Sequence, residues 1–394
     1  DVRDMTFNLD WGGENISFDN VVTAIRKSGA SIVGIQEAEG NLQRLAGALG
    51  WNYDLRNYVI SGFPLIDPPG ANGKYVLAEV KPGQVVAIAN VHLPSDPYGP
   101  DAIRDGAKPE DVLELERTTR LPEIQPYLKA LVPLIERDIP VFLTGDFNAP
   151  SHTDWTDATV GERAFLRYAL AWPVSLAVTA AGFRDSWRVV HPDPVTDPGL
   201  TWWAGRPPLE AYTPGENDAQ DRIDFVWYAG PAKALSAKVV GEAGGPGVSV
   251  SVMPWPSDHR AVVSDFKVMP AAMPEVVSTS HRVYTHGDDI DISYNIPPGE
   301  SRLISVANSN TGDYAVTNRL VEADGTLRLG ADLFGPGSYE AYMAQADGSG
   351  TLARNFWVLA AGAVPTVQLS DDTFENGQAI GITWSNAPGN RNDY

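Results

Sequence analysis

The segment Val141-Phe-Leu-Thr-Gly-Asp-Phe-Asn148 passes from an apolar run into two polar residues, Asp146 and Asn148. A short apolar run that ends in a polar, glycine-containing group is typical of a buried strand followed by a turn. We therefore predict a strand over residues 140–148, with both polar side chains at its carboxyl end. Taken alone, Gly-Asp-Phe-Asn also fits a turn in which Asp146 and Asn148 bond to the local backbone.

The same pattern recurs along the first two thirds of the chain, where polar residues stand at the carboxyl ends of other predicted apolar strands. These residues are Asn8, Asp10, Gln36, Glu37, Asn90, His92, Asp221, Arg222, Asp224, Asp258 and His259. Singly, each is explained equally well by a solvated loop, a salt bridge or a satisfied core histidine. Together they predict a rigid polar cleft over a buried core. Hard carboxylate and amide oxygens beside histidines favour metal-assisted hydrolysis with Mg²⁺ or Mn²⁺ rather than zinc.

Composition excludes several other kinds of chemistry. The 394 residues contain no cysteine, so disulfides, thiolate nucleophiles and Cys-ligated zinc are ruled out. With 29 Lys and Arg against 50 Asp and Glu, the net charge of −21 argues against a non-specific nucleic-acid binder. The sequence lacks an apolar run of about 18 residues, so we expect no membrane-spanning helix. Because the chain starts at Asp1 rather than Met, we expect that a leader has been removed.

Residues 1–268 alternate predicted strands with helical stretches, which indicates a layered α/β domain with helices on the outer faces of its sheets. The further predicted strands are 5–9, 31–36, 58–62, 75–80, 85–93, 222–228 and 261–268. Ser17 can cap a helix that ends at Gly29. A longer helix is predicted from the capping-box spacing of Asp111 and Glu114, with Pro122, Pro126 and Pro133 expected to bend or break it.

The composition changes after residues 269–274, which we interpret as a linker. Residues 275–362 alternate apolar and polar residues between Gly, Pro, Asn and Asp turns, a pattern typical of a β-sandwich of the immunoglobulin or fibronectin kind. Val277, Ile292 and Tyr294 recur 90 positions later as Val367, Ile382 and Trp384, and Pro298-Gly299 recurs as Pro388-Gly389. Residues 363–394 are therefore predicted to begin a second, truncated β-sandwich repeat.

The ordered motifs of residues 1–268 resemble the endonuclease/exonuclease/phosphatase (DNase I-like) superfamily. The matching motifs are Asn8, Gln36-Glu37, Asn90-Val-His92, Gly145-Asp-Phe-Asn148, Arg222-Ile-Asp224 and Ser257-Asp-His259, with further matches at Phe183–Arg188 and Thr201–Trp203. The resemblance implies a four-layer α/β/β/α sandwich for residues 1–268. It also implies a hydrolase that requires a divalent metal, either magnesium (Mg²⁺) or Mn²⁺, with Ca²⁺ as a further alternative.

The resemblance assigns roles to individual residues. Glu37 resembles the principal metal ligand, with Asn8, Asp10 and Asp258 near the same ion. The implied catalytic residues are His92, Asp146, Asn148, Asp224 and His259. In this set, Asn148 and His92 would hold phosphoryl oxygens, and Asp224 would orient His259. Either Asp146 or His259 would take the proton of the attacking water.

Four further residues are candidates for substrate binding, namely Ser151, His152, Arg188 and Arg222. Ser151 and His152 follow the Gly-Asp-Phe-Asn group closely and would line the cleft. The two arginines suit a phosphate, but a salt bridge to Asp185, Asp221 or Asp224 explains them equally well.

The acidic loops at residues 96–105, 193–197 and 210–221 disfavour duplex nucleic acid as a partner. We therefore expect a phosphodiesterase or phosphatase that acts on a small-molecule or lipid-type phosphoester. One alternative is a secreted nuclease acting on DNA or RNA. Another is a surface-binding protein in which the β-sandwich modules bind a surface or another protein and the hydrolase scaffold is inactive. Tandem sandwich modules favour a secreted, periplasmic or cell-surface location.

Overall fold

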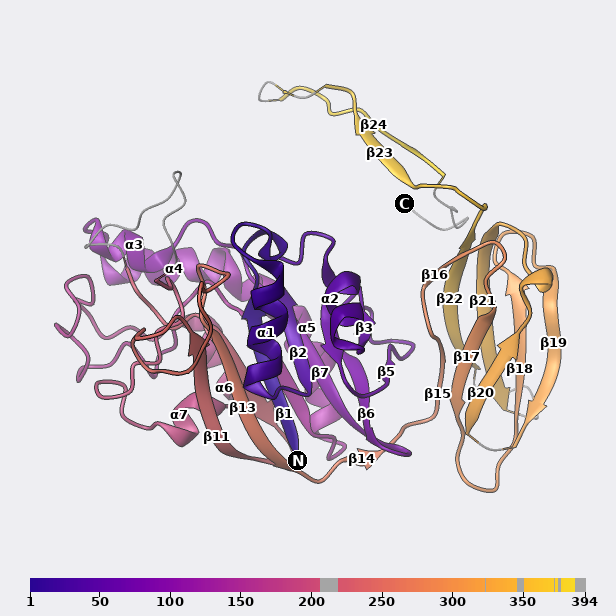
Figure 1. The fold of residues 1–394 in the computed structure, drawn as a ribbon, viewed down its shortest axis with the longest axis horizontal. Helices are drawn as coiled ribbons and strands as arrows, with labels where there is room; N and C mark the ends of the chain where they lie inside the picture. The colour runs from indigo at the N-terminus through magenta and orange to yellow at the C-terminus, as the bar shows by residue number, and fades with distance from the viewer. Residues whose placement is uncertain (206–218, 323, 346–350, 372, 375–376, 387–394) are drawn as a thin grey trace. The chain divides into compact units, whose positions relative to one another are not determined.

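The computed structural model describes residues 1–394 except 206–218, 323, 346–350, 372, 375–376 and 387–394. It divides the chain into two compact units. The first comprises Asp1–Leu65 and Ala71–Ala272, and the second comprises Ile66–Gly70 and Met273–Tyr394 (Figure 1). Most of the predicted acidic loop 210–221, and the repeat residues Pro388 and Gly389, lie outside the described residues. In the described part of the chain, no helix is long and apolar enough to cross a membrane.

Two β-sheets form the centre of the first unit. One has the strand order β12-β11-β13-β1-β2-β4-β3, and its strands are Val248–Ser251, Ala232–Gly241, Ala261–Val268, Val2–Asn8, Ile32–Gln36, Val59–Ser61 and Asn52–Asp54. The other has the order β5-β6-β7-β8-β10-β9, with strands Leu65–Ile66, Val76–Lys81, Gln84–His92, Val141–Asp146, Asp224–Ala229 and Arg184–Asp185. A short strand, β14 (Ala271–Ala272), also pairs with β7. Every predicted strand of residues 1–268 is present, with bounds that differ by a few residues.

The strand β11 was not predicted, although it is one of the longest of the first unit. Its sequence Ala-Lys-Ala-Leu-Ser-Ala-Lys-Val-Val-Gly contains small and charged residues that have low strand propensity. The strand forms because β13 pairs with it on one side and β12 on the other. Tertiary pairing therefore overrides the weak local preference of this segment.

Apolar side chains join the two sheets face to face. Ile88 and Phe142 of the second sheet are fully buried in one core with Val262 and Phe266 of the first, and the rings of Phe142 and Phe266 lie 4.7 Å apart. A strand that is buried on both faces has a nearly continuous run of apolar residues in its sequence. Such runs made these inner strands predictable.

Helices cover the outer faces of this pair of sheets. On the first sheet lie α1 (Phe18–Ser28) and α2 (Leu42–Leu49), and α1 buries Val21 and Ile25 against the sheet. The predicted caps are confirmed, since Ser17 accepts a hydrogen bond from the Asn20 N–H at 3.2 Å and Gly29 adopts the left-handed conformation. On the second sheet, α5 (Arg120–Ile135) packs against β7 and β8. The first unit thus has the α/β/β/α layering of the expected fold.

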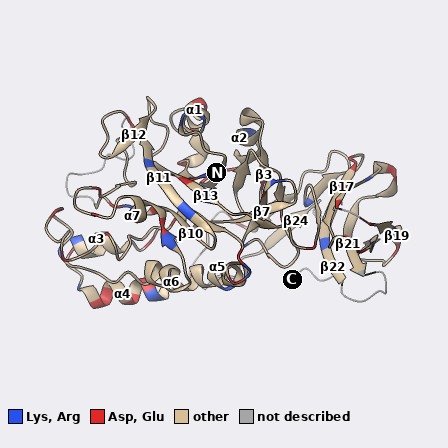
Figure 2. Cartoon of the chain, turned by 90° about the horizontal axis from the view of Figure 1, so that it is seen from below, with Lys and Arg blue, Asp and Glu red and all other residues tan. Residues whose placement is uncertain are grey.

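The remaining helices of the first unit are α3 (Gly99–Arg104), α4 (Pro109–Thr118), α6 (Pro173–Ala180) and α7 (Ser186–Val190). The prediction that Asp111 begins a helix was wrong, because α4 starts at Pro109, whose fixed φ suits the first helical position. Figure 2 shows positions of both acidic and basic residues along the ribbon of α4.

The predicted long helix is interrupted at Thr119, shortly before Pro122, where α4 ends and α5 begins, whereas α5 continues through Pro126 and Pro133. Both rings lie on the exposed face of the helix, where water can bond to the carbonyls that lose their partners.

Two sheets of the second unit share one core. The first sheet has the order β15-β17-β20 (Val276–Thr279, Ile290–Asn295, Gly325–Leu329). The second has the order β16-β22-β21-β18-β19 (Val283–Thr285, Thr351–Leu359, Gly337–Gln345, Arg302–Asn308, Tyr314–Val321). Val277, Ile292, Ile304 and Phe356 are fully buried between them.

A separate hairpin of β23 (Thr366–Leu369) and β24 (Ile382–Ser385) follows in the same unit. Its register repeats that of β15 and β17 at an offset of 90, because Val367 pairs with Trp384 as Val277 pairs with Tyr294. The burial does not repeat, since Val367 is 71% exposed and Val277 is fully buried. The sequence repeat therefore carries over to strand pairing but not to packing.

Candidate active site

The polar residues of the predicted cleft meet at one edge of the two sheets. Asn8, His92 and Asp146 are the last residues of β1, β7 and β8, and Glu37 directly follows β2. Asp224, by contrast, is the first residue of β10, and Asp258 and His259 precede β13, so their predicted placement at carboxyl strand ends was wrong. They still reach the same edge because β10 runs antiparallel to β8, with Asp224 opposite Asp146 in the register, and β13 runs antiparallel to β1.

Asp146 lies at the centre of this group and is almost fully buried. Its Oδ2 accepts a hydrogen bond from Asn8 Nδ2 at 3.1 Å, and its Oδ1 accepts one from the backbone N–H of Asn148 at 2.9 Å. The Nε2 atoms of His92 and His259 lie 3.6 and 3.7 Å from Asp146 Oδ2. One carboxylate is thus shared by two imidazole rings and two amides.

A chain of hydrogen bonds fixes the orientation of His259. Its Nδ1 is 2.9 Å from Asp224 Oδ2, so Nε2 is the ring atom that faces Asp146. The backbone N–H of His259 donates to Ser257 Oγ at 3.0 Å, and that hydroxyl donates to the Asn8 carbonyl at 2.7 Å. This arrangement ties the turn before β13 to the end of β1.

The electrostatics of the site follow from burial and close charges. Burial raises the pKa of Asp146 to about 6, although the charge of His259 acts to lower it. Burial alone would lower the pKa of His259, but Asp224, Asp146 and Asp258 outweigh it and raise the pKa well above 6.5. Near neutral pH the site therefore holds an ionised Asp146 beside a protonated His259.

Glu37 adopts the left-handed conformation, with φ 52°, directly after β2. Its Oε1 accepts a hydrogen bond from Asn8 Nδ2 at 3.0 Å and lies 4.0 Å from His92 Nε2, and its Oε2 accepts one from the Trp11 N–H at 3.4 Å. The Gly12 N–H donates to the Glu37 carbonyl at 2.7 Å, so the turn after Asp10 wraps around Glu37. Asp10 itself accepts a hydrogen bond from Asn15 Nδ2 at 3.0 Å.

The donors at this edge fit a hard divalent cation. Asp146, Asp224 and His259 each offer one ligand atom, and these three atoms lie within 4.8 Å of one another. Asp224 Oδ1 is buried and accepts no hydrogen bond in the described part of the chain, so it can still take a further donor or a cation. Glu37 adds a carboxylate next to this group, which is the kind of donor that Mg²⁺ and Mn²⁺ prefer, whereas Asn8 turns its Nδ2 toward Glu37 and Asp146 and accepts the Asp10 N–H with its Oδ1.

The predicted substrate-binding residues take other positions. The side chain of Arg222 is buried and contacts Asp154 and Asp185 at 2.8 and 2.6 Å, and Arg188 Nε donates to Asp154 at 2.7 Å. Both arginines thus form salt bridges, as the alternative held, but of the partners it named only Asp185 is confirmed, with Arg222, and Asp154 was not predicted. Ser151 is fully buried, and His152 Nδ1 lies 2.8 Å from Ser175 Oγ. We therefore leave these four residues out of the site.

Gln36 and Asn90, which are neighbours of the predicted ligands, act as structural cross-links. Asn90 Oδ1 on β7 accepts a hydrogen bond from Gln36 Nε2 on β2 at 2.6 Å. Its Nδ2 donates to the carbonyls of Ile35 and Tyr58 at 2.8 and 3.2 Å. The two sheets are thus joined directly beneath the site.

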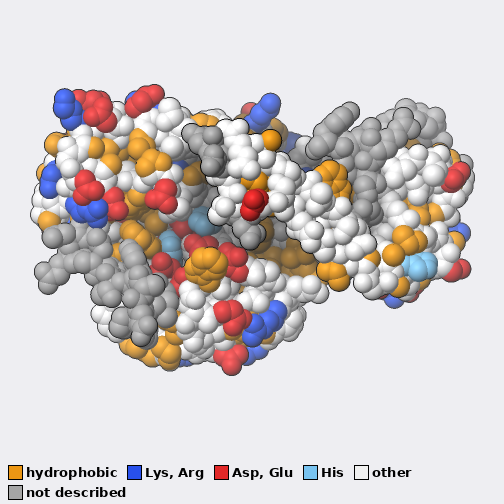
Figure 3. Space-filling view, turned by 90° about the horizontal axis from the view of Figure 1, so that it is seen from above, with side chains coloured by type: hydrophobic (Ala, Val, Ile, Leu, Met, Phe, Trp, Pro, Cys, Tyr) orange, Lys and Arg blue, Asp and Glu red, His pale blue; other side chains and the backbone are white. Residues whose placement is uncertain are grey.

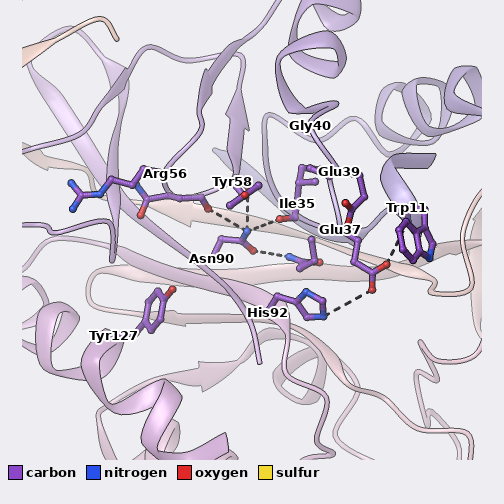
Figure 4. A pocket seen from close by; sticks show the side chains of 13 residues that line it. Trp11, Ile35, Glu37, Glu39, Gly40, Arg56, Tyr58, Asn90, His92 and Tyr127 are labelled. Atoms are coloured by element: carbon purple, nitrogen blue, oxygen red, sulfur yellow. Dashed lines mark hydrogen bonds and ion pairs between the residues drawn. The ribbon is translucent and has the colours of Figure 1, made fainter. Parts of the chain in front are cut away.

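A pocket of about 800 Å³ opens beside Glu37 and His92 (Figure 4). Its lining includes Trp11, Arg56, Tyr58 and Tyr127, none of which belongs to the matching motifs. Arg56 and Tyr58 come from the segment between β3 and β4, and Tyr127 comes from α5, so no sequence motif links them. In Figure 3, histidine and acidic side chains lie in a hollow of the molecular surface.

Comparisons with known proteins agree with this description. The profile of the Endonuclease/Exonuclease/phosphatase family matches residues 5–259. An uncharacterised protein of Caenorhabditis elegans is 29% identical over 294 residues, which cover 67% of this chain and 91% of that protein.

Among solved structures, an AP endonuclease from Archaeoglobus fulgidus is similar at 12% identity and a TM-score of 0.42, covering 68% of this chain and 100% of the other. A mannosyl-6-phosphatase from Bacteroides thetaiotaomicron is similar at 14% identity and a TM-score of 0.35, again over 68% and 100%. The family profile spans most of the first unit. It includes the residues that meet at the edge of the two sheets, namely Asn8, Glu37, His92, Asp146, Asp224 and His259. This chain therefore belongs to the Endonuclease/Exonuclease/phosphatase family.

Proposed function

We propose that this chain is a divalent-metal-dependent phosphoesterase that hydrolyses the P–O bond of a small-molecule or lipid-type phosphodiester or phosphomonoester. The observation that carries the proposal is the orientation of His259. Asp224 holds its Nδ1 at 2.9 Å so that Nε2 faces Asp146, which Asn8 connects to Glu37. Hydrolysis of a P–O ester is also the reaction common to the activities in the family name.

Phosphoester hydrolysis needs an activated water and positive charge around the phosphoryl oxygens. Glu37 and Asn8, with Asp10 and Asp258 nearby, would hold a Mg²⁺ or Mn²⁺ ion, or Ca²⁺. That ion would supply positive charge to the phosphoryl group. His92, Asn148 and protonated His259 add hydrogen-bond donors at the same place. The side-chain amide of Asn148 donates to the Leu93 carbonyl at 2.9 Å and to Asp146 Oδ2 at 3.4 Å, so a phosphoryl oxygen would have to replace the longer of these two bonds.

Asp146 is the better candidate for the base that accepts the proton of the attacking water. It lies between two imidazole rings and is ionised near neutral pH, whereas the ring of His259 has its Nδ1 against Asp224 and carries a proton. An anionic carboxylate can accept a proton, and an imidazolium cannot. His259 then donates a hydrogen bond to the phosphoryl group.

A panel of phosphoesters tests the proposal. Bis-aryl phosphate, mononucleotides, phospholipid headgroup esters and plasmid DNA are incubated with the full chain in Mg²⁺, in Mn²⁺ and in excess chelator. We expect hydrolysis of at least one small or lipid-type ester that the chelator abolishes. Cleavage restricted to plasmid DNA would instead establish the nuclease alternative, which the buried Arg188 and Arg222 disfavour. Absence of all hydrolysis would overturn the proposal.

For the second unit we propose an immunoglobulin- or fibronectin-like module at residues 275–362 and the first strands of a second repeat in residues 363–394. Two sheets around one core and the matching register at an offset of 90 support this assignment. Such modules commonly bind a surface or another protein, which favours a secreted, periplasmic or cell-surface location. Immunodetection of the chain in culture medium and in cell fractions tests the location.

A further inference from the structure

We propose that the pocket beside Glu37 and His92 binds the leaving group of the substrate and selects leaving groups that carry a flat ring. This inference rests on the proposed phosphoesterase function and names the class of ester that the site prefers. Trp11 and Tyr58 are the residues that would contact the ring, and neither belongs to the strand-end motifs.

The position of the pocket favours the leaving group. Asn8 Nδ2 bridges Asp146 Oδ2 and Glu37 Oε1, at 3.1 and 3.0 Å, so the site runs from His259 through Asp146 to Glu37. The pocket opens at the Glu37 end (Figure 4). In an in-line displacement the water and the leaving oxygen stand on opposite sides of phosphorus. A water activated at Asp146 therefore directs the leaving group toward Glu37 and the pocket.

The lining of the pocket offers aromatic surface. Trp11 is 65% exposed and Tyr58 is 49% exposed, although both side chains are large and apolar. Tyr127 contributes a third ring from α5, and in Figure 4 it lies across the pocket from Tyr58. Exposed aromatic rings that line a concave site are suited to stacking on a planar or sugar ring.

The backbone holds the two exposed rings in uncommon conformations. Trp11 has φ 55° and Tyr58 has φ 51°, in the left-handed region that bulky residues rarely adopt. Hydrogen bonds fix both residues there, because the Trp11 N–H donates to Glu37 and the Tyr58 carbonyl accepts from Ile35 N–H at 2.9 Å and from Asn90. The cross-link that joins the sheets thus also positions Tyr58 at the pocket.

The charges and the size of the pocket narrow the class of ligand. Glu37 and Glu39 are acidic, and Arg56 is the one Lys or Arg among the lining residues, all of which are described. A polyanionic chain would be repelled, whereas a neutral ring or a ring with one further anionic group fits. The volume of about 800 Å³ lies in the range of sites for small molecules and exceeds what a methyl or ethyl group fills.

The reaction balances without any further reactant. The water oxygen forms a bond to phosphorus, and the water proton passes to Asp146. The bond between phosphorus and the leaving oxygen breaks, and its electron pair goes to that oxygen. The leaving alkoxide takes up one proton from solvent and departs through the pocket as the ring-bearing alcohol. The phosphate monoester or phosphate stays beside His92 and His259 until it is released, and Asp146 returns its proton to solvent.

The test compares esters that differ in the leaving group alone. Benzyl phosphate and ethyl phosphate, and their methyl diesters, release alcohols of similar acidity, so their intrinsic reactivities are close. We expect the full chain in Mg²⁺ to prefer the benzyl ester by about 10-fold in kcat/KM. Thymidine monophosphate and glucose 6-phosphate, assayed alongside, distinguish a nucleobase from a sugar ring as the natural source of the ring.

Substitutions in the pocket should reduce this preference. We expect the benzyl-to-ethyl ratio to fall about 10-fold in Trp11→Ala and in Tyr58→Ala, and to persist in Trp11→Phe. Trp384→Ala and Tyr168→Ala remove equally exposed aromatic rings elsewhere and should leave the ratio unchanged. A ratio near one for the unmodified chain, or a ratio that neither pocket variant changes, would overturn the inference.

A binding measurement separates this inference from the proposed function. Benzylphosphonate and ethylphosphonate cannot be hydrolysed, and calorimetric titration of the full chain with Mg²⁺ gives their affinities without turnover. If no ester is hydrolysed, the proposed function fails. Tighter binding of benzylphosphonate, lost in Trp11→Ala, would still support a ring-binding pocket, whereas equal affinities would overturn it.

Discussion

Two buried groups of charged residues in the first unit lead to opposite conclusions about their roles. The ionic cluster consists of Asp154, Asp185, Arg188 and Arg222, two carboxylates against two guanidinium groups, all buried. The strand-end cluster consists of Asn8, Glu37, His92, Asp146, Asp224 and His259, three carboxylates against two imidazoles, and it opens into a pocket at Glu37. The ionic cluster has balanced charges and is closed to solvent, so it stabilises the fold. The strand-end cluster has an excess of carboxylates and opens into a pocket, so it leaves negative charge for a cation to neutralise.

Replacement of His259 by alanine should have the largest effect on activity. The change removes the hydrogen-bond donor that Asp224 directs toward Asp146, so we expect turnover to fall by about 10²–10⁴-fold. Steady-state kinetics on the preferred ester measure the loss, and circular dichroism checks that the fold is retained. A rate close to that of the unmodified chain would remove His259 from the reaction.

Replacement of Glu37 by glutamine should abolish most of the activity by weakening metal binding, with little loss of stability, because Glu37 is partly exposed. Calorimetric titration with Mn²⁺ measures the affinity directly. Glu14→Gln is the matched control, since Glu14 is an exposed acid that pairs with Arg44 outside the strand-end cluster. Unchanged activity of Glu37→Gln at saturating Mg²⁺ would count against the metal site.

The ionic cluster should respond to substitution in stability rather than in chemistry. Arg222→Met leaves Asp154 and Asp185 buried without their shared partner, so we expect the free energy of unfolding to fall by about 3–5 kcal/mol. Arg117→Met removes an exposed pair with Glu114 and should change stability by less than about 0.5 kcal/mol. Denaturant titration compares the two variants, and equal effects would make the ionic cluster dispensable for stability.

Acidification should affect the stability contributions of the two clusters in different pH ranges. For any single group, we expect this effect to be smaller than that of a substitution in either cluster. Burial raises the pKa of Asp154, but Arg222 and Arg188 outweigh it and hold the pKa below 3.8. Its contribution to stability is therefore present above about pH 3.8 and is lost as the pH falls further. Asp146 has the opposite sign, since its pKa of about 6 in the folded state exceeds 3.8. Its contribution is present at low pH and is lost as the pH rises through about 6.

From these signs we expect activity to fall below about pH 6, as Asp146 takes up a proton, while the fold persists until the pH drops below about 4. Activity assays on the full chain and thermal unfolding in chelator measure the two profiles. A melting temperature that decreases in parallel with activity between pH 6 and 4.5 would contradict the separation of the clusters.

Much of the first unit was predictable because its signals are local. The apolar runs of the inner strands, the Ser17 cap and the Gly29 terminus depend on neighbouring residues alone, and each appears in the structure. The strand β11 and the uninterrupted helix α5 were not predictable, since pairing with β13 and the exposure of two prolines decide them. The sequence repeat at an offset of 90 residues indicated how β23 and β24 pair, but it did not indicate that Val367 is exposed.

The sequence by itself determined the family and the order of the polar groups, because six short motifs mark the strand ends in one arrangement. Tertiary structure decided which of these groups meet. Arg222 stands 68 residues from Asp154 along the chain, and only folding brings them within 2.9 Å, away from the cleft. Folding also assembled the pocket of Trp11, Tyr58 and Tyr127 from three separate elements. Contacts between distant segments form only when the whole core packs, so no local sequence pattern predicts them.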